Sequence, residues 1–107
     1  MRRIWPLFLM VLSTAAVSTA QDSAAGAKVF ADQKCSLCHS IGGKGNAKGP
    51  LDDVGSKLSA GDIRAWVEDA AGMTTKTNAT RKPAMKSYSL PKSDVDNLVA
   101  YLSTLKK

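Results

Sequence analysis

The sequence has few of the side chains that build metal and redox sites in proteins. Its 107 residues include two cysteines and one histidine. A structural zinc site needs four ligands, usually in two separated pairs, so the sequence argues against zinc. It has six aromatic residues and no nucleic-acid-binding motif, which argues against a nucleic-acid partner. No strand pattern precedes the cysteines, and the periodicity that remains is helical.

Both cysteines and the histidine stand in one run, Cys35-Ser36-Leu37-Cys38-His39. This C-x-x-C-H pattern is the signature for covalent attachment of a c-type haem. Two thiols three residues apart lie about one helical turn from each other, so each can add to one vinyl group on a porphyrin edge. The imidazole of His39 then comes where it can reach the iron as proximal ligand. The run therefore predicts one covalently bound haem c per chain.

The same pair of cysteines has two other interpretations. A C-x-x-C pair can be a dithiol redox centre, but such a centre is expected after a strand in a βαβ setting. It can also be a structural disulfide, but a bridge between Cys35 and Cys38 closes too small a loop to stabilise a fold appreciably. Haem attachment is the interpretation that we favour.

Residues 1–20 have the pattern of a signal peptide. Two arginines precede residues 4–17, a mostly apolar stretch of the length of a signal core and short for a membrane span. Small residues at 18–20 predict cleavage after Ala20, which would leave 21–107 as one domain in the periplasm. The alternative is an uncleaved anchor. No second apolar stretch follows, so we expect no stable membrane insertion once the signal is removed.

Apolar residues recur at helical spacing in three segments. The first covers residues 23–33, the second begins near Ser59 and stops at Gly72, and the third runs from 91–93 to about Leu105. The fold class predicted from this pattern is all-α, with long loops between the helices.

Two segments are predicted to be those loops. Residues 40–57 are rich in glycine and lysine, and residues 73–92 contain Pro83 and Pro91, which argue against regular structure throughout. The glycine-rich segment lacks the preceding strand and the GK[ST] ending of a P-loop, so no phosphate site is expected there.

The iron needs a sixth ligand or keeps an open position. After residue 20 the methionines are Met73 and Met85. Met85 is the preferred ligand because it lies mid-loop after the conformationally fixed Pro83, whereas Met73 abuts a predicted helix end. Met73 and an open or exchangeable site are the alternatives.

Over nearly all of residues 22–107 the chain resembles the class I c-type cytochromes, small monohaem electron carriers with an all-α fold. In this family the N- and C-terminal helices cross, and loops with one or two shorter helices enclose the haem. The resemblance is carried, in this order along the chain, by Gly26, Phe30, the C-x-x-C-H run, Gly49-Pro50-Leu51, Trp66, Met85-Lys86-Ser87-Tyr88, Leu98 and Tyr101.

The resemblance also implies roles for single residues. The carbonyl of Pro50 would accept a hydrogen bond from the proximal imidazole, Trp66 would pack near the haem, and Met85 would be the distal ligand. One feature departs from the family pattern. Many members have proline directly after the ligand methionine, whereas here Pro83 precedes it by two residues.

As a function, the resemblance implies a monomeric periplasmic carrier of single electrons that is not an enzyme. One alternative is a haem c electron-transfer subunit of a larger periplasmic oxidoreductase, and another is a haem-based gas-binding protein. After residue 20 there are 13 basic and 9 acidic residues, a formal +4, and residues 72–92 hold five basic residues and no acidic one. If such loops frame the haem edge, redox partners with acidic docking faces are expected. The alternative is that these lysines are ordinary solvated loop residues.

Overall fold

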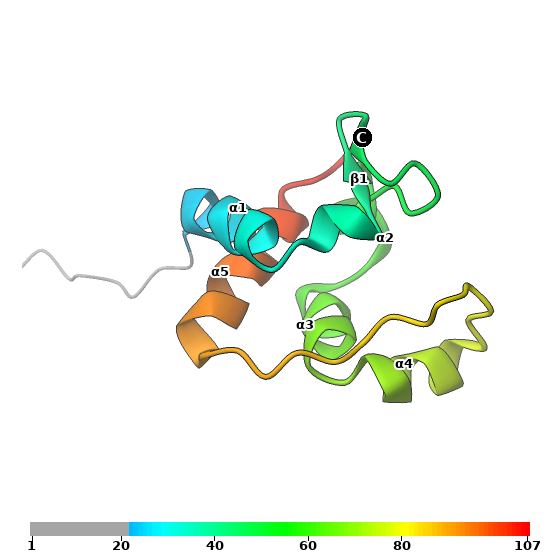
Figure 1. The fold of residues 1–107 in the computed structure, drawn as a ribbon. Coiled ribbons are helices and arrows are strands. Elements are labelled where there is room, and N and C mark those ends of the chain that lie inside the picture. Colours follow the sequence, from blue (N-terminus) through cyan, green and yellow to red (C-terminus); the bar gives the residue numbers. More distant parts are fainter. Residues whose placement is uncertain (1–21) are drawn as a thin grey trace, which may run out of the picture.

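The computed structural model describes residues 22–107, and helices dominate it, as the all-α prediction requires (Figure 1). The predicted signal peptide at 1–20 lies outside the described residues. The helices are α1 (Ser23–Asp32), α2 (Val54–Lys57), α3 (Ala60–Glu68), α4 (Ala70–Thr77) and α5 (Lys92–Ser103). The other elements are a 3-10 turn, η1 (Cys35–Leu37), and the short strands β1 (Ser40–Ile41) and β2 (Lys44–Gly45). None of the helices in 22–107 is long and apolar enough to cross a membrane.

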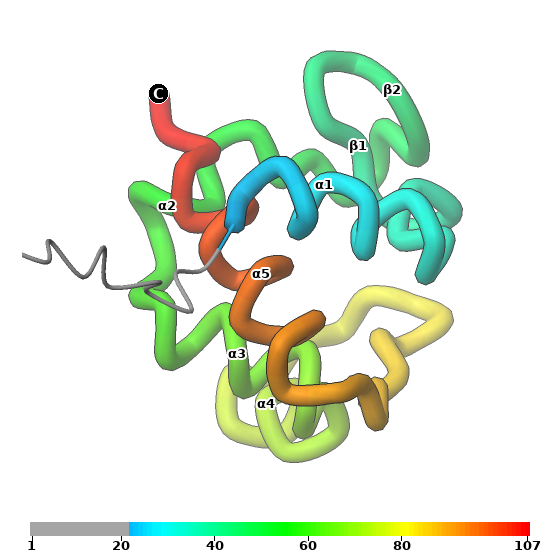
Figure 2. The backbone as a smooth tube through the Cα atoms, turned by 90° about the vertical axis from the view of Figure 1, so that its left-hand side faces the viewer, coloured from blue at the N-terminus to red at the C-terminus, as the bar shows by residue number. Residues whose placement is uncertain are grey.

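The frame of the fold is the crossing of α1 over α5 (Figure 2). Their backbones meet at Gly26, where an added Cβ would lie 2.0 Å from the carbonyl oxygen of Asn97. The backbone N–H of Asp22 donates to Asn97 Oδ1 over 2.9 Å, and the rings of Phe30 and Tyr101 pack edge to face with centroids 6.1 Å apart. A crossing of the N- and C-terminal helices is what the family resemblance implied.

The core lies between α1, α3 and α5. Each helix turns its predicted apolar face toward it, and the buried cluster contains Val29, Phe30, Ile63, Val67, Val95, Leu98, Val99 and Leu102. Local caps fix where two of these helices begin. The carboxylate of Asp22 accepts from the N–H groups of Ala24 and Ala25, and Ser59 Oγ accepts from the N–H of Asp62.

The predicted boundary at Gly72 is wrong. Helix α3 already ends at Glu68, and α4 begins at Ala70 and continues to Thr77, within a segment that was predicted to be a loop. The reason is Asp69, whose side chain accepts from the N–H of Gly72 and caps a new helix. Burial of Ala70 and Met73 then stabilises this helix against its poor intrinsic propensity.

The segment from 40 to 57 is also more ordered than a plain loop. Strands β1 and β2 pair antiparallel, with Ser40 opposite Gly45, and a further parallel bridge joins Ser40 to Pro50. Helix α2 follows and is tied to the end of the chain, because the N–H of Gly55 donates to the carbonyl of Leu105 over 2.8 Å. These contacts hold the residues after the C-x-x-C-H run against the rest of the fold.

Candidate haem site

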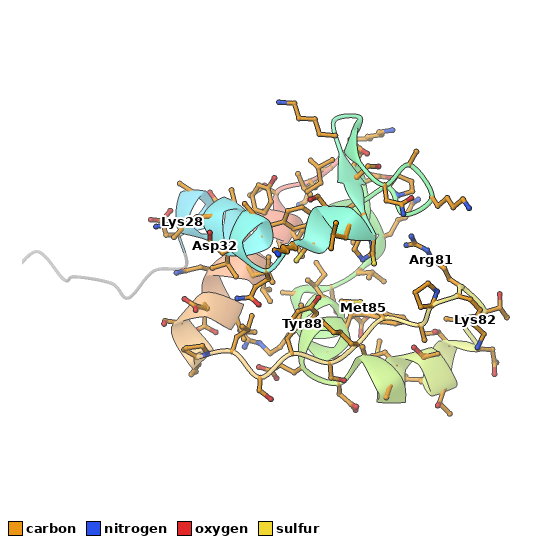
Figure 3. The ribbon with its side chains drawn as sticks, viewed as in Figure 1. Lys28, Asp32, Arg81, Lys82, Met85 and Tyr88 are labelled. Atoms are coloured by element: carbon orange, nitrogen blue, oxygen red, sulfur yellow. The ribbon has the colours of Figure 1, made fainter. Side chains whose placement is uncertain are left out.

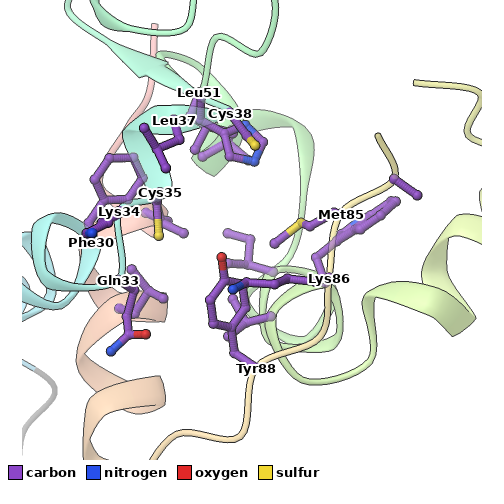
Figure 4. Close-up of a pocket in the computed structure, with 18 of the residues that line it drawn as sticks. Phe30, Gln33, Lys34, Cys35, Leu37, Cys38, Leu51, Met85, Lys86 and Tyr88 are labelled. Atoms are coloured by element: carbon purple, nitrogen blue, oxygen red, sulfur yellow. The ribbon is translucent and has the colours of Figure 1, made fainter. Parts of the chain in front are cut away.

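A mostly apolar cavity of about 610 Å³ opens beside the C-x-x-C-H run. Its volume falls within the range of roughly 300–1,000 Å³ that small-molecule and cofactor sites have. Cys35 and Cys38 lie on one side, and Met85 faces them from the segment between α4 and α5 (Figure 4). Apolar lining comes from α1, α3, α5 and the segment around α2, through Phe30, Leu51, Ile63, Val67, Leu98 and Leu102.

The two thiols are presented by η1, which starts after a left-handed residue, Lys34, with φ of 56°. They are not joined in a disulfide. Cys35 is half-buried and Cys38 exposed, so the pair stands at the edge of the cavity. Burial raises the pKa of the Cys35 thiol, a shift opposed by a hydrogen bond from the residue's own backbone to the sulfur. Dithiol redox centres lower a cysteine pKa instead, so this environment disfavours the redox interpretation.

His39 is oriented by a single hydrogen bond, between its Nδ1 and the carbonyl oxygen of Gly49, 3.1 Å away. Because a carbonyl can only accept, Nδ1 is the nitrogen that carries the proton, and Nε2 keeps its lone pair. Burial lowers the pKa of His39, and the nearby positive charge of Arg81 adds to this, while the bond to Gly49 opposes it. The ring is therefore held as a neutral imidazole, the form that binds a metal.

The predicted acceptor for this bond, the carbonyl of Pro50, is replaced by its neighbour Gly49 in the structure. The bridge between Ser40 and Pro50 explains the difference. It directs the Gly49 carbonyl toward the N–H of Ser40, 3.0 Å away, and hence toward the residue before it, His39. Pro50 itself does not line the cavity.

Met85 and Met73 occupy different environments. Met85 lines the cavity, and its side chain points toward the two cysteines (Figure 4). Met73 is buried on α4 and is not among the lining residues. Trp66, on α3, does line the cavity. The structure thus brings together Cys35, Cys38, His39, Trp66 and Met85, and leaves Met73 and Pro50 outside the lining.

Arg81 is one of the lining residues that were not predicted as part of the site. Arg81 was counted only among the basic loop residues, yet its Nη2 donates to the carbonyl of Cys38 over 2.6 Å. It lies next to Gly49, where an added Cβ would come within 2.2 Å of Arg81 Nη1. Nothing in the sequence distinguishes this arginine from its neighbour Lys82, because the contact spans 43 positions.

The donor set fits a haem and not a bare metal ion. Within residues 22–107 no three His, Cys, Asp or Glu side chains come together as metal ligands. The site offers one neutral imidazole, one thioether and a broad apolar cavity with two thiols at its edge. These are the groups that an iron porphyrin attached as haem c requires. The residues that would hold it are Cys35, Cys38, His39 and Met85.

Comparison with known proteins agrees with this geometry. The family model described as "Cytochrome c" matches residues 23–106. The chain is also similar to the cytochrome c oxidase subunit 2 of Alkalihalophilus pseudofirmus, with 29% identity over 90 residues. That match covers 76% of this chain and 25% of the relative, so the chain spans about a quarter of that protein's length. No solved structure matches the chain. The chain belongs to the cytochrome c family, whose members transfer electrons through a covalently bound haem c.

Proposed function

We propose that the protein is a monomeric periplasmic carrier of single electrons, with His39 and Met85 as the axial ligands of its haem iron. The observation that supports this most is the placement of Met85 across the cavity from the cysteines (Figure 4). The signal pattern of residues 1–20 supports export, because c-type haem is joined to reduced thiols outside the cytoplasm of bacteria. No bond of a substrate is made or broken, so we propose that it is not an enzyme.

The bound haem would supply the one-electron couple, and the chain would hold and tune it. Cys35 and Cys38 would anchor the porphyrin edge through thioether bonds. His39 keeps one orientation through its donation to the Gly49 carbonyl, which also raises the basicity of the ligating nitrogen. The apolar lining excludes water, and the neutral thioether of Met85 favours ferrous iron. Axial ligands that stay the same in both oxidation states need little rearrangement when an electron is transferred.

Replacing each methionine by leucine tests the ligand assignment, because this change keeps an apolar side chain of similar volume and removes the sulfur. We expect Met85→Leu to abolish the weak long-wavelength absorption band of a sulfur–iron bond in the oxidised protein. Met73→Leu is the matched control and should keep the band, since Met73 lies outside the cavity lining. Retention of the band in Met85→Leu would contradict the assignment. Rapid binding of carbon monoxide by the reduced wild-type protein would favour the gas-binding alternative.

The mouth of the cavity is positively charged. Lys34, Arg81 and Lys86 line it, and no Asp or Glu in the described part of the chain does. All three are exposed. A cationic rim around the haem edge would steer the carrier toward redox proteins with acidic docking faces and exclude cationic ones.

Removing one rim charge should therefore slow association with an acidic redox protein. We expect Lys34→Gln to lower the second-order rate of electron transfer about two- to fivefold at low ionic strength, with the difference vanishing at high salt. Lys28→Gln is the matched control, because Lys28 is an exposed lysine of α1 that does not line the cavity (Figure 3). Stopped-flow measurement of the electron-transfer rate over a series of salt concentrations tests this expectation. Equal effects of both changes, or a rate independent of salt, would contradict steering.

A second candidate function is that of an electron-transfer subunit within a larger oxidoreductase. The similarity to a cytochrome c oxidase subunit 2 favours it, because about a quarter of that protein's length matches 76% of this chain. Size-exclusion chromatography of a native extract distinguishes the two. Co-elution of the haem with a larger enzyme would favour the subunit, and elution at the size of the single chain would favour the free carrier.

A further inference from the structure

The segment that carries Met85 has almost no hydrogen bonds of its own. From residue 80 to residue 87, within the described chain, no backbone N–H or carbonyl is bonded to another residue. The next anchor is the N–H of Tyr88, which donates to the carbonyl of Val67 on α3 over 2.8 Å. On the other side the nearest backbone bond is that of Ala79 to Thr74. The segment is also exposed apart from Met85 itself.

Within residues 80–87 a single hydrogen bond reaches another element, and its donor is Arg81. The guanidinium donates from Nη2 to the carbonyl oxygen of Cys38 over 2.6 Å. It extends from the segment toward the loop that follows the cysteines, whereas the neighbouring Lys82 lies at the outer tip of the segment (Figure 3). Gly49 leaves room for this contact, because an added Cβ there would lie 2.2 Å from Arg81 Nη1.

The position of this bond is specific. The carbonyl of Cys38 belongs to the peptide that joins the second thiol to His39, so Arg81 ties the distal side of the site to the residue before the proximal imidazole. Met85 lies between the Arg81 bond and the Tyr88 bond, four residues after the first and three before the second. A charged donor on a backbone carbonyl is about twice as strong as a neutral one, which suits a contact that acts alone.

We propose that Arg81 is a positioning residue for the distal ligand: its bond to Cys38 closes the Met85 segment over the cavity and keeps the thioether at the iron. This inference rests on the proposed function, because it takes Met85 as a ligand. Without the bond, the segment has no polar tie between Ala79 and Tyr88, and Met85 leaves the iron more often. Arg81 would thereby set how readily small external ligands enter the site.

The test is the rate at which imidazole binds to the oxidised holoprotein. At saturating imidazole this rate is limited by departure of the methionine, so it measures opening of the segment directly. We expect Arg81→Ala to raise the limiting rate roughly tenfold, which corresponds to loss of one exposed charge-assisted hydrogen bond. Arg81→Lys, which keeps a charge and a donor but loses the planar fork, should fall between the wild type and Arg81→Ala.

Lys82→Ala is the matched control, because it removes one positive charge from the adjacent exposed position and breaks no hydrogen bond. It should leave the limiting rate within about twofold of the wild type. Equal acceleration in Arg81→Ala and Lys82→Ala would assign the effect to charge and overturn the proposal. An unchanged rate in Arg81→Ala would also overturn it.

Two further measurements separate failure of this proposal from misfolding of the variant and from failure of the ligand assignment. The helical circular dichroism of Arg81→Ala should match that of the wild type, because Arg81 lies outside the helices. Tm should fall by no more than roughly 10 °C, the shift that loss of one such hydrogen bond causes in a domain of this size. Loss of helix content, or a larger fall in Tm, would overturn a local role. If the wild-type protein itself lacks the sulfur–iron band, the ligand assignment fails and this proposal fails with it. If the band is present but the limiting rate of imidazole binding is the same in Arg81→Ala and the wild type, this proposal alone fails.

Discussion

A chain with both Cys35→Ala and Cys38→Ala is expected to lose most of its helical circular dichroism at 25 °C. The reason is the size of the cavity relative to the stability of the domain. The cavity of about 610 Å³ is lined mainly by apolar side chains. Without the haem these side chains stay in contact with water, and each Å² of apolar surface left exposed forgoes about 25 cal/mol of stabilisation. A domain of this size has a free energy of unfolding of only about 4–13 kcal/mol, at ~0.05–0.15 kcal/mol per residue. Loss of part of its hydrophobic stabilisation is therefore enough to unfold it.

The measurement is far-ultraviolet circular dichroism of the variant purified from a host that attaches haem c. Ser36→Ala is the control, because it changes the same turn and leaves both thiols in place. It should retain the haem and the wild-type spectrum. Native-like helix content in the doubly substituted chain would show that the protein moiety folds alone, and that the haem is not its main source of stability.

The parts of the fold that could be predicted are those with a local signature. The apolar faces of α1, α3 and α5 follow the helical period, and the caps at Asp22 and Ser59 stand directly before them. Helix α4 was missed because its sequence argues against it: Gly72 and several threonines have poor helix propensity. The Asp69 cap and the burial of Met73 outweigh that propensity, and burial is a property of the whole fold.

The residues of the site also divide into those with a local sequence signature and those that depend on the whole fold. The three residues of the C-x-x-C-H run could be predicted because the chemistry fixes their spacing, and Met85 could be predicted because few other ligands exist. All four line the cavity. Gly49 and Arg81 were missed because both act through contacts that depend on tertiary structure. The first is directed at His39 by the bridge between Ser40 and Pro50, and the second reaches Cys38 across 43 positions. Neither contact leaves a pattern in the sequence.

The crossing of α1 and α5 makes Gly26 the position where a single methyl group should have a large effect on stability. An added Cβ would lie 2.0 Å from the carbonyl oxygen of Asn97 and 2.6 Å from Cβ of Tyr101. Because the first of these is backbone, no side-chain rotation relieves the overlap, and the two helices must move apart. We expect Gly26→Ala to cost about 3 kcal/mol or more, which should lower Tm of the holoprotein by roughly 10 °C or more.

Gly61 on α3 provides a matched control, at which the same substitution should change the stability in the opposite direction. An added Cβ there has its nearest neighbour at 3.8 Å, in the Ser59 side chain, and the position is exposed. Gly61→Ala therefore gains helix propensity without a clash and should stabilise the protein by up to about 1 kcal/mol. Since the chemical change is the same at both sites, a difference in sign isolates the helix crossing as the cause. Thermal unfolding of both variants, followed by circular dichroism, measures it, and stabilisation by Gly26→Ala would mean that α1 and α5 do not meet at this glycine.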